Sequence, residues 1–169
     1  MVLTESKMLP LGSSAPDFNL KGIDNKMHPL EEYSSAKVLV IVFMCNHCPY
    51  VQKIWTDMVE MVAVMPGEVQ FVGINSNANS NYPEDSFEKM SKYANEKGHN
   101  FPYLYDENQE AAKAYGAVCT PDFFVYDAQR KLSYRGNFEG IESAVEDLLE
   151  NKKPTESQKP SMGCSIKWN

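Results

Sequence analysis

Two cysteines, Cys45 and Cys48, form a C-x-x-C motif and are the residues of this chain best suited to chemistry. The motif directly follows an apolar run, 38–44, and precedes a segment whose apolar residues have helical spacing. A helix N-terminus stabilises a thiolate through free backbone N–H groups and its dipole. We expect Cys45 at or just before that N-terminus and Cys48 about one turn further along the same face. Because the thiolate is the nucleophile of disulfide exchange, the spacing predicts a redox-active pair.

Three neighbours of the two cysteines could support this chemistry. His47 lies between them, and a cation there would favour the Cys45 thiolate, whereas a solvated histidine would have no redox influence. A more stable reduced form makes the disulfide a stronger oxidant, so we expect a reduction potential above about −270 mV. Pro49 fits the first turn of a helix, where its missing N–H costs little. Asn46 also lies inside the motif, and we expect it to support the reactive pair.

The other two cysteines, Cys119 and Cys164, each have two interpretations. A buried cysteine that only packs is common, but either thiol could also take part in disulfide exchange. Cys164 lies in a polar C-terminal tail, 151–169, that ends with apolar residues costly to leave exposed. We therefore expect the tail to dock on the domain, and we keep Cys119 and Cys164 as possible additional redox residues.

The bulk composition limits the classes of function. A chain of 169 residues suits one domain with a sizeable core. Its net charge of −7 argues against nucleic acid or an anionic membrane as the main partner. No apolar run approaches the ~20 residues that cross a bilayer, and the N-terminus lacks the apolar segment of a secretory signal. We expect a cytoplasmic protein, in which a C-x-x-C indicates catalysis or metal binding rather than a disulfide scaffold.

The elements that must position the motif follow from the hydrophobic pattern. Alternating or continuous apolar runs predict strands at 15–20, 38–44, 69–74, 101–105, 121–126 and 131–135. Apolar spacings of three and four, with Pro or Gly at the ends, predict helices at 50–65, 83–98, 108–115 and 141–150. Residues 1–14 look like a loose arm, 27–33 are ambiguous, and the polar loop 75–81 either lines the site or is plain surface. The order implies a mainly parallel sheet covered on both faces, with an antiparallel hairpin at one edge.

Several segments together carry a family resemblance. CNHCP, APDFNL, GINSN, YPEDSFEKM, AKAYGAVCTPDFFVYD and GCSIKW resemble the peroxiredoxin-like branch of the thioredoxin-fold superfamily, with its AhpC/TSA and TlpA-like thiol-disulfide oxidoreductases. The resemblance covers almost the whole chain and implies one thioredoxin-like α/β domain over 1–169, with three α/β/α layers and a mixed sheet with an N-terminal β extension. It also implies that Pro121 is a cis-proline beside the dithiol and that Thr120 offers backbone groups to an extended peptide or thiol.

The chain departs from this family pattern at two places. Peroxiredoxins carry a threonine three residues before the peroxidatic cysteine. Val42 stands there if Cys45 is the counterpart, and Cys45 itself stands there if Cys48 is, so neither alignment restores the motif. Thioredoxins carry a buried acid on the strand before the motif, and 38–44 contains no acid. The first departure weighs against peroxidase activity, and the second leaves His47 or water as a proton acceptor.

Three functions therefore compete. The leading hypothesis is an enzyme, a thiol-disulfide oxidoreductase for protein or small-molecule thiols and disulfides, in which Cys45 attacks and Cys48 resolves. The second is a peroxiredoxin-like thiol peroxidase with antioxidant activity, in which peroxide oxidises Cys45 to a sulfenic acid. The third is a metallochaperone for Cu(I) or zinc, although one C-x-x-C supplies too few ligands for a structural zinc site. We expect neither a cofactor nor a resident metal, and the sequence indicates no oligomeric state.

Overall fold

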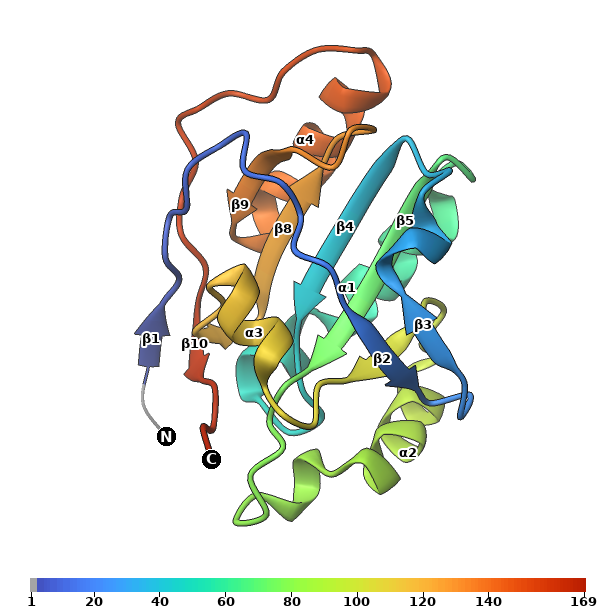
Figure 1. Ribbon diagram of the computed structural model, residues 1–169, viewed down its shortest axis with the longest axis vertical. Helices are drawn as coiled ribbons and strands as arrows, with labels where there is room; N and C mark the ends of the chain where they lie inside the picture. The colour runs from blue at the N-terminus through green and yellow to red at the C-terminus, as the bar shows by residue number, and fades with distance from the viewer. Residues whose placement is uncertain (1–2) are drawn as a thin grey trace.

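A computed structural model describes residues 3–169 and contains a seven-stranded mixed sheet with helices on both faces (Figure 1). The order of its strands is β3-β2-β6-β5-β4-β8-β9. Their bounds are β2 Asn19–Gly22, β3 Met27–Pro29, β4 Val38–Phe43, β5 Val69–Asn75, β6 Tyr103–Tyr105, β8 Asp122–Tyr126 and β9 Leu132–Gly136. The helices are α1 Pro49–Val64, α2 Phe87–Lys97, α3 Glu110–Tyr115 and α4 Ile141–Leu149.

Strand β4 lies inside the sheet, between β5 and β8, and all of its side chains are fully buried. Successive side chains of a strand point to opposite faces, so β4 contributes to two cores. Its even-numbered residues pack with α1, α2 and α4, while its odd-numbered residues pack with α3 on the other face. The strand pairs parallel with β5 and antiparallel with β8. The expected mixed sheet in a three-layer α/β/α arrangement is therefore confirmed.

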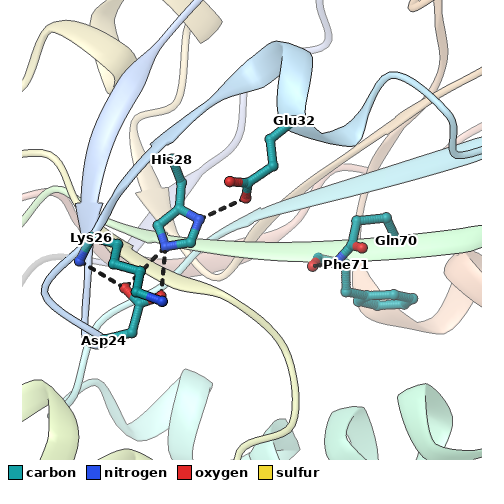
Figure 2. Close-up of polar contacts among 6 residues, drawn as sticks. All are labelled: Asp24, Lys26, His28, Glu32, Gln70 and Phe71. Atoms are coloured by element: carbon teal, nitrogen blue, oxygen red, sulfur yellow. Dashed lines mark hydrogen bonds and ion pairs between the residues drawn. The ribbon is translucent and has the colours of Figure 1, made fainter.

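The hairpin of β2 and β3 forms one edge of the sheet, where β2 pairs antiparallel with β6. His28 of β3 lies between two carboxylates, as Figure 2 shows, with Nε2 2.9 Å from Asp24 and Nδ1 2.6 Å from Glu32. Burial opposes protonation of the ring, but hydrogen bonds to Glu32 and Asp24 outweigh it and raise the pKa of His28. These contacts tie the turn of the hairpin to the 3-10 turn Leu30–Tyr33 that follows.

Three predicted elements differ from the observed ones. The prediction of one continuous helix at 83–98 is wrong. A 3-10 turn, Pro83–Asp85, is separated from α2 by the extended backbone of Ser86. The strand at 121–126 starts earlier and is interrupted, with β7 Cys119–Thr120 on one side of Pro121 and β8 on the other. Proline has no N–H to continue a ladder. The first sheet strand lies at Asn19–Gly22 rather than at 15–20.

A second, three-stranded sheet was not predicted. It places β10, Met162–Ser165, between β7 and the N-terminal strand β1, Leu3–Glu5, in antiparallel pairing (Figure 1). The expectation of a loose arm is therefore wrong for β1, whose pairing partner lies at the other end of the chain. The C-terminal tail packs on the domain, and Ile166 is buried in the core on the α3 side.

Candidate active site

Cys45 and Cys48 lie in the loop that joins β4 to α1, and both are buried, with 1% and 2% of their surface exposed. Cys48 is the N-cap residue of α1 and has extended backbone, while Pro49 begins the helix. The sequence placed Cys45 nearest the helix N-terminus, but Cys48 holds that position. The backbone N–H groups of the first turn therefore act on Cys48 more directly than on Cys45.

The Cys48 sulfur lies at the centre of a cluster of sulfur and oxygen atoms. Its Sγ is 2.9 Å from the Sγ of Cys164 and 3.4 Å from the carbonyl oxygen of Thr120, to which Cys48 donates when it is protonated. The Cys45 Sγ lies 3.7 Å from the Thr120 Oγ1 and also shares a hydrogen bond with the Cys48 sulfur. All four cysteines of the chain are free. The structure is therefore that of the reduced protein, with three thiols gathered at one place.

The negative charge of the reduced pair is stabilised on Cys48. A hydrogen bond from Cys45 lowers the pKa of Cys48 to about 4 against the opposing effect of burial, with Cys164, Thr120 and the Val51 N–H also favouring the thiolate. The same hydrogen bond, together with burial, raises the pKa of the Cys45 thiol well above its usual value. We expected the thiolate on Cys45, and the geometry favours Cys48 instead. The shared proton consequently lies on Cys45 in the resting state.

Asp85 is a buried acid that contacts the motif loop, whereas the strand before the motif has no acid. Its carboxylate accepts a hydrogen bond of 2.9 Å from the backbone N–H of His47 and one of 3.0 Å from the side-chain amide of Asn77. Its charge adds to the raised pKa of Cys45. The His47 side chain is exposed, and among residues 3–169 no hydrogen bond joins its imidazole to a sulfur. The proposed redox influence of His47 stays a prediction.

Asn46 holds the motif loop against its surroundings. Its side-chain amide donates to the carbonyl oxygen of Glu84 at 3.0 Å and to that of Ser86 at 3.3 Å. Its side-chain oxygen accepts a bond of 2.9 Å from the Tyr103 hydroxyl, and its backbone carbonyl accepts a bond from the Gln52 amide. These contacts fix the backbone between the two cysteines, and the supporting role of Asn46 in the chemistry stays a prediction.

The loop that carries Thr120 and Pro121 packs against the dithiol, and the peptide bond between them is cis, as the resemblance implied. The backbone of Thr120 is not open to an extended peptide, because Cys164 of β10 is paired opposite it. Cys119 is also buried, but its Sγ contacts the Pro121 carbonyl at 3.9 Å rather than a sulfur. Burial raises the pKa of Cys119, with a contribution from the charge of Asp122. The structure thus joins Cys164, and not Cys119, to the reactive pair.

A cavity of about 300 Å³ opens on the three thiols. Its lining consists of Cys45, His47, Cys48, Asn77, Tyr82, Asp85, Cys164 and Lys167. Asn77 confirms that the polar loop 75–81 reaches the site. Tyr82, Asp85 and Lys167 were not singled out from the sequence. The available signal was their place inside YPEDSFEKM and GCSIKW, two of the segments that carried the family resemblance.

Two further findings concern metal sites and membrane spans. Within the described residues, no group of three or more His, Cys, Asp or Glu side chains has the arrangement of a metal site. The same part of the chain, 3–169, includes no helix with the length and apolar character of a membrane span.

Comparison with known proteins gives this site a family. The AhpC/TSA family matches residues 11–135. The chain belongs to the AhpC/TSA family. A solved uncharacterized conserved protein from Geobacillus kaustophilus is 47% identical, with a TM-score of 0.96 over 100% of this chain and 97% of that one. A hypothetical protein from Sinorhizobium meliloti is 36% identical, with a TM-score of 0.96 over 98% of both chains.

The chain is also similar to a protein with a stated activity. The thiol-disulfide oxidoreductase ResA of Geobacillus thermodenitrificans is 25% identical over 161 residues, covering 89% of this chain and 83% of that protein. Solved thioredoxin-like domains from oxidoreductases are 15% to 20% identical and have TM-scores of 0.64 to 0.71. At that identity the likeness concerns the fold alone, and it confirms the thioredoxin-like fold expected from the sequence.

Proposed function

We propose that this protein is an enzyme, a thiol-disulfide oxidoreductase, whose reacting groups are Cys45 and Cys48. The observation that carries the proposal is a thiol and a stabilised thiolate, hydrogen-bonded to each other and both lining one small cavity. The relation to ResA supports the same class of reaction. Partners are thiols and disulfides, and the covered backbone of Thr120 favours small molecules over extended peptides. The cytoplasmic location expected from the sequence stays a prediction.

We propose Cys45 as the attacking residue and Cys48 as the resolving residue, with the Cys48 thiolate acting first as the base that accepts the Cys45 proton. The Cys48 thiolate first takes the proton of Cys45, and the Cys45 thiolate then attacks a substrate disulfide, whose bond breaks and releases one thiolate. That leaving group takes the proton from Cys48. The Cys48 thiolate attacks the Cys45 sulfur of the mixed disulfide, the Cys45–Cys48 bond forms, and the second substrate thiolate leaves. Once Cys45 is part of the mixed disulfide it no longer donates to Cys48, but Cys164, Thr120 and the Val51 N–H still favour the Cys48 thiolate, which suits the resolving role.

Disulfide exchange with oxidised glutathione, and in parallel with a disulfide-bridged peptide, tests the proposal. We expect Cys45→Ser and Cys48→Ser to lose turnover, while Cys119→Ala, the matched control at a buried cysteine that contacts no other sulfur, keeps it. Cys48→Ser should accumulate a glutathione adduct on Cys45. Full turnover by Cys45→Ser would refute the proposal, and an adduct confined to Cys48 in the Cys45→Ser protein would reverse the two roles.

Peroxide reduction is a second candidate because Thr120 supplies a hydroxyl that Val42 cannot. The Thr120 Oγ1 lies 3.7 Å from the Cys45 Sγ, so a threonine does contact this sulfur, from the cis-proline loop rather than from the preceding strand. The hydroxyl favours the Cys45 thiolate, although the hydrogen bond to Cys48 and burial outweigh it. Stopped-flow oxidation by hydrogen peroxide should be slower in Thr120→Val than in Thr120→Ser. A wild-type rate no faster than that of free cysteine would exclude this function.

A further inference from the structure

We propose that Cys164 is a third redox-active cysteine, which exchanges the Cys45–Cys48 disulfide for a Cys48–Cys164 disulfide. This inference rests on the proposed function and extends it. The Sγ atoms of Cys48 and Cys164 are 2.9 Å apart, and closing this distance to a disulfide bond requires a movement of only about 0.9 Å. Cys48 touches both other thiols, so it is the sulfur common to two possible bridges.

The position of Cys164 is fixed by the backbone around it. Strand β10 is paired on both sides, with Leu3 of β1 and Thr120 of β7 opposite Cys164. Gly163 permits this approach, because a Cβ atom there would lie 1.9 Å from the carbonyl oxygen of Thr120. The contact between Cys164 and Cys48 is therefore built by the register of the small sheet and by a glycine next to the cysteine.

Residues on both sides of β10 anchor the strand as well. Ahead of it, the Ser161 N–H donates to the Ser6 hydroxyl at 2.8 Å. Beyond it, the Ile166 N–H donates to the Val118 carbonyl at 3.0 Å and the Lys167 N–H donates to the Asn77 side chain at 3.0 Å. The segment that carries Cys164 is thus held at both ends, and its backbone cannot move away from Cys48 without breaking these bonds.

The local electrostatics changes with the redox state. In the reduced protein, burial and the hydrogen bond to Cys48 raise the pKa of Cys164 to about 12, while Lys167 acts in the opposite direction. Once Cys48 is part of a disulfide, its negative charge is gone, whereas the Lys167 ammonium remains beside the cavity. Formation of the Cys45–Cys48 disulfide therefore favours ionisation of Cys164, which is the step that a nucleophile requires.

The exchange conserves atoms and electrons. The Cys164 thiol loses its proton and attacks the Cys48 sulfur of the Cys45–Cys48 disulfide. The Cys48–Cys164 bond forms as the Cys45–Cys48 bond breaks, and the Cys45 sulfur leaves with the electron pair and accepts a proton. No outside oxidant or reductant is consumed, because one disulfide is present before and after. The oxidised enzyme then has a free Cys45 thiol facing the cavity.

Peptide mapping of the oxidised protein tests this exchange. The wild type is oxidised with one equivalent of diamide, quenched in acid, alkylated and digested. We expect both the Cys45–Cys48 and the Cys48–Cys164 bridges, with alkylated Cys45 in the second form. In Cys164→Ala the second bridge and the labelling of Cys45 should be lost, while Cys119→Ala should match the wild type.

The decisive variant is Cys45→Ser, with Cys45→Ala as a second choice should the serine impair folding. Oxidation of this protein should give a Cys48–Cys164 disulfide, although the C-x-x-C motif is gone. Absence of that bridge in the folded variant, together with only the Cys45–Cys48 bridge in the wild type, would overturn the inference. The outcome is separable from the proposed function, since turnover of oxidised glutathione by the wild type, and its loss in Cys48→Ser, test that function whether or not a bridge to Cys164 forms.

Discussion

His99 offers a prediction whose magnitude follows from the structure. Its Nδ1 accepts a hydrogen bond of 3.0 Å from the indole N–H of the fully buried Trp55, and its ring contacts Phe101 and Tyr103. Its Nε2 is shielded from solvent and has no hydrogen-bond partner within the described residues. Burial lowers the pKa of His99 to about 4, against a small opposing contribution from the Phe101 backbone. The folded protein therefore keeps His99 neutral where an unfolded chain would protonate it.

The sign of the effect is acid destabilisation. The pKa of His99 is 6.5 in the unfolded chain and about 4 in the folded protein. The free energy of unfolding therefore decreases as pH falls below 6.5, until the folded form is protonated as well. Linkage gives a loss of about 2 kcal/mol between pH 8 and pH 5, and about 3 kcal/mol at full effect. Substitution of His99 by Gln keeps an acceptor for the Trp55 indole and removes the titration.

Urea unfolding at pH 8 and pH 5 measures this difference. The free energy of unfolding of the wild type should fall by about 2 kcal/mol more than that of His99→Gln over this range. Contributions from other titrating groups cancel in the comparison of the two proteins. Parallel pH dependences, within about 0.5 kcal/mol, would refute the reasoning, as would a His99 ring resonance that titrates near pH 6.5 in the folded protein.

Three further predictions concern other parts of the molecule. Gly163→Ala should destabilise the protein by about 1 to 3 kcal/mol, because the new Cβ meets the Thr120 backbone. It should also speed alkylation of Cys164 by iodoacetamide, and an unchanged melting temperature and labelling rate would contradict this. Burial raises the pKa of Asp122 well above its usual value, so the free energy of unfolding falls as pH rises above 3.8. In urea unfolding, Asp122→Asn should therefore be about 1 to 3 kcal/mol more stable than the wild type at pH 8, with little gain at pH 4. Because the pKa of His28 is raised, its protonated ring stabilises the fold fully below pH 6.5, and this stabilisation is lost above the folded pKa. His28→Gln should therefore lower the free energy of unfolding by about 0.5 to 1 kcal/mol at pH 5.5 and leave it unchanged at pH 9. An equal loss at both pH values would show that packing, not charge, is responsible.

The parts of the fold that the sequence predicts are those with strong local patterns. The apolar run of β4 and the helical spacing of α1 place the motif at the end of the central strand, within a residue of the observed bounds. The short strands β1 and β10 carry no such pattern, because only three or four residues take part and their stability comes from pairing with distant segments. Local propensity cannot reveal a partner at the other end of the chain.

For the site as well, local patterns could be predicted from the sequence, and contacts between distant segments could not. The C-x-x-C spacing identifies the two reactive cysteines, since the motif itself supplies both thiols and the helix that follows. Which sulfur carries the charge depends on Cys164 and Thr120, which the fold brings to Cys48 from distant positions. Asp85 could not be recognised as a partner of the motif, because it looks like an ordinary acid at the start of a predicted helix.

The pairing of β10 with β7 also links the redox state to the overall stability of the molecule. A Cys45–Cys48 bridge closes a very short loop and barely restricts the unfolded chain. A bridge between Cys48 and Cys164 joins residues 116 positions apart and would stabilise the folded protein by about 2 to 5 kcal/mol through loop-closure entropy. The two disulfide isomers have the same number of electrons but would melt at different temperatures. Heat resistance of the oxidised enzyme would then report which pair of sulfurs is joined.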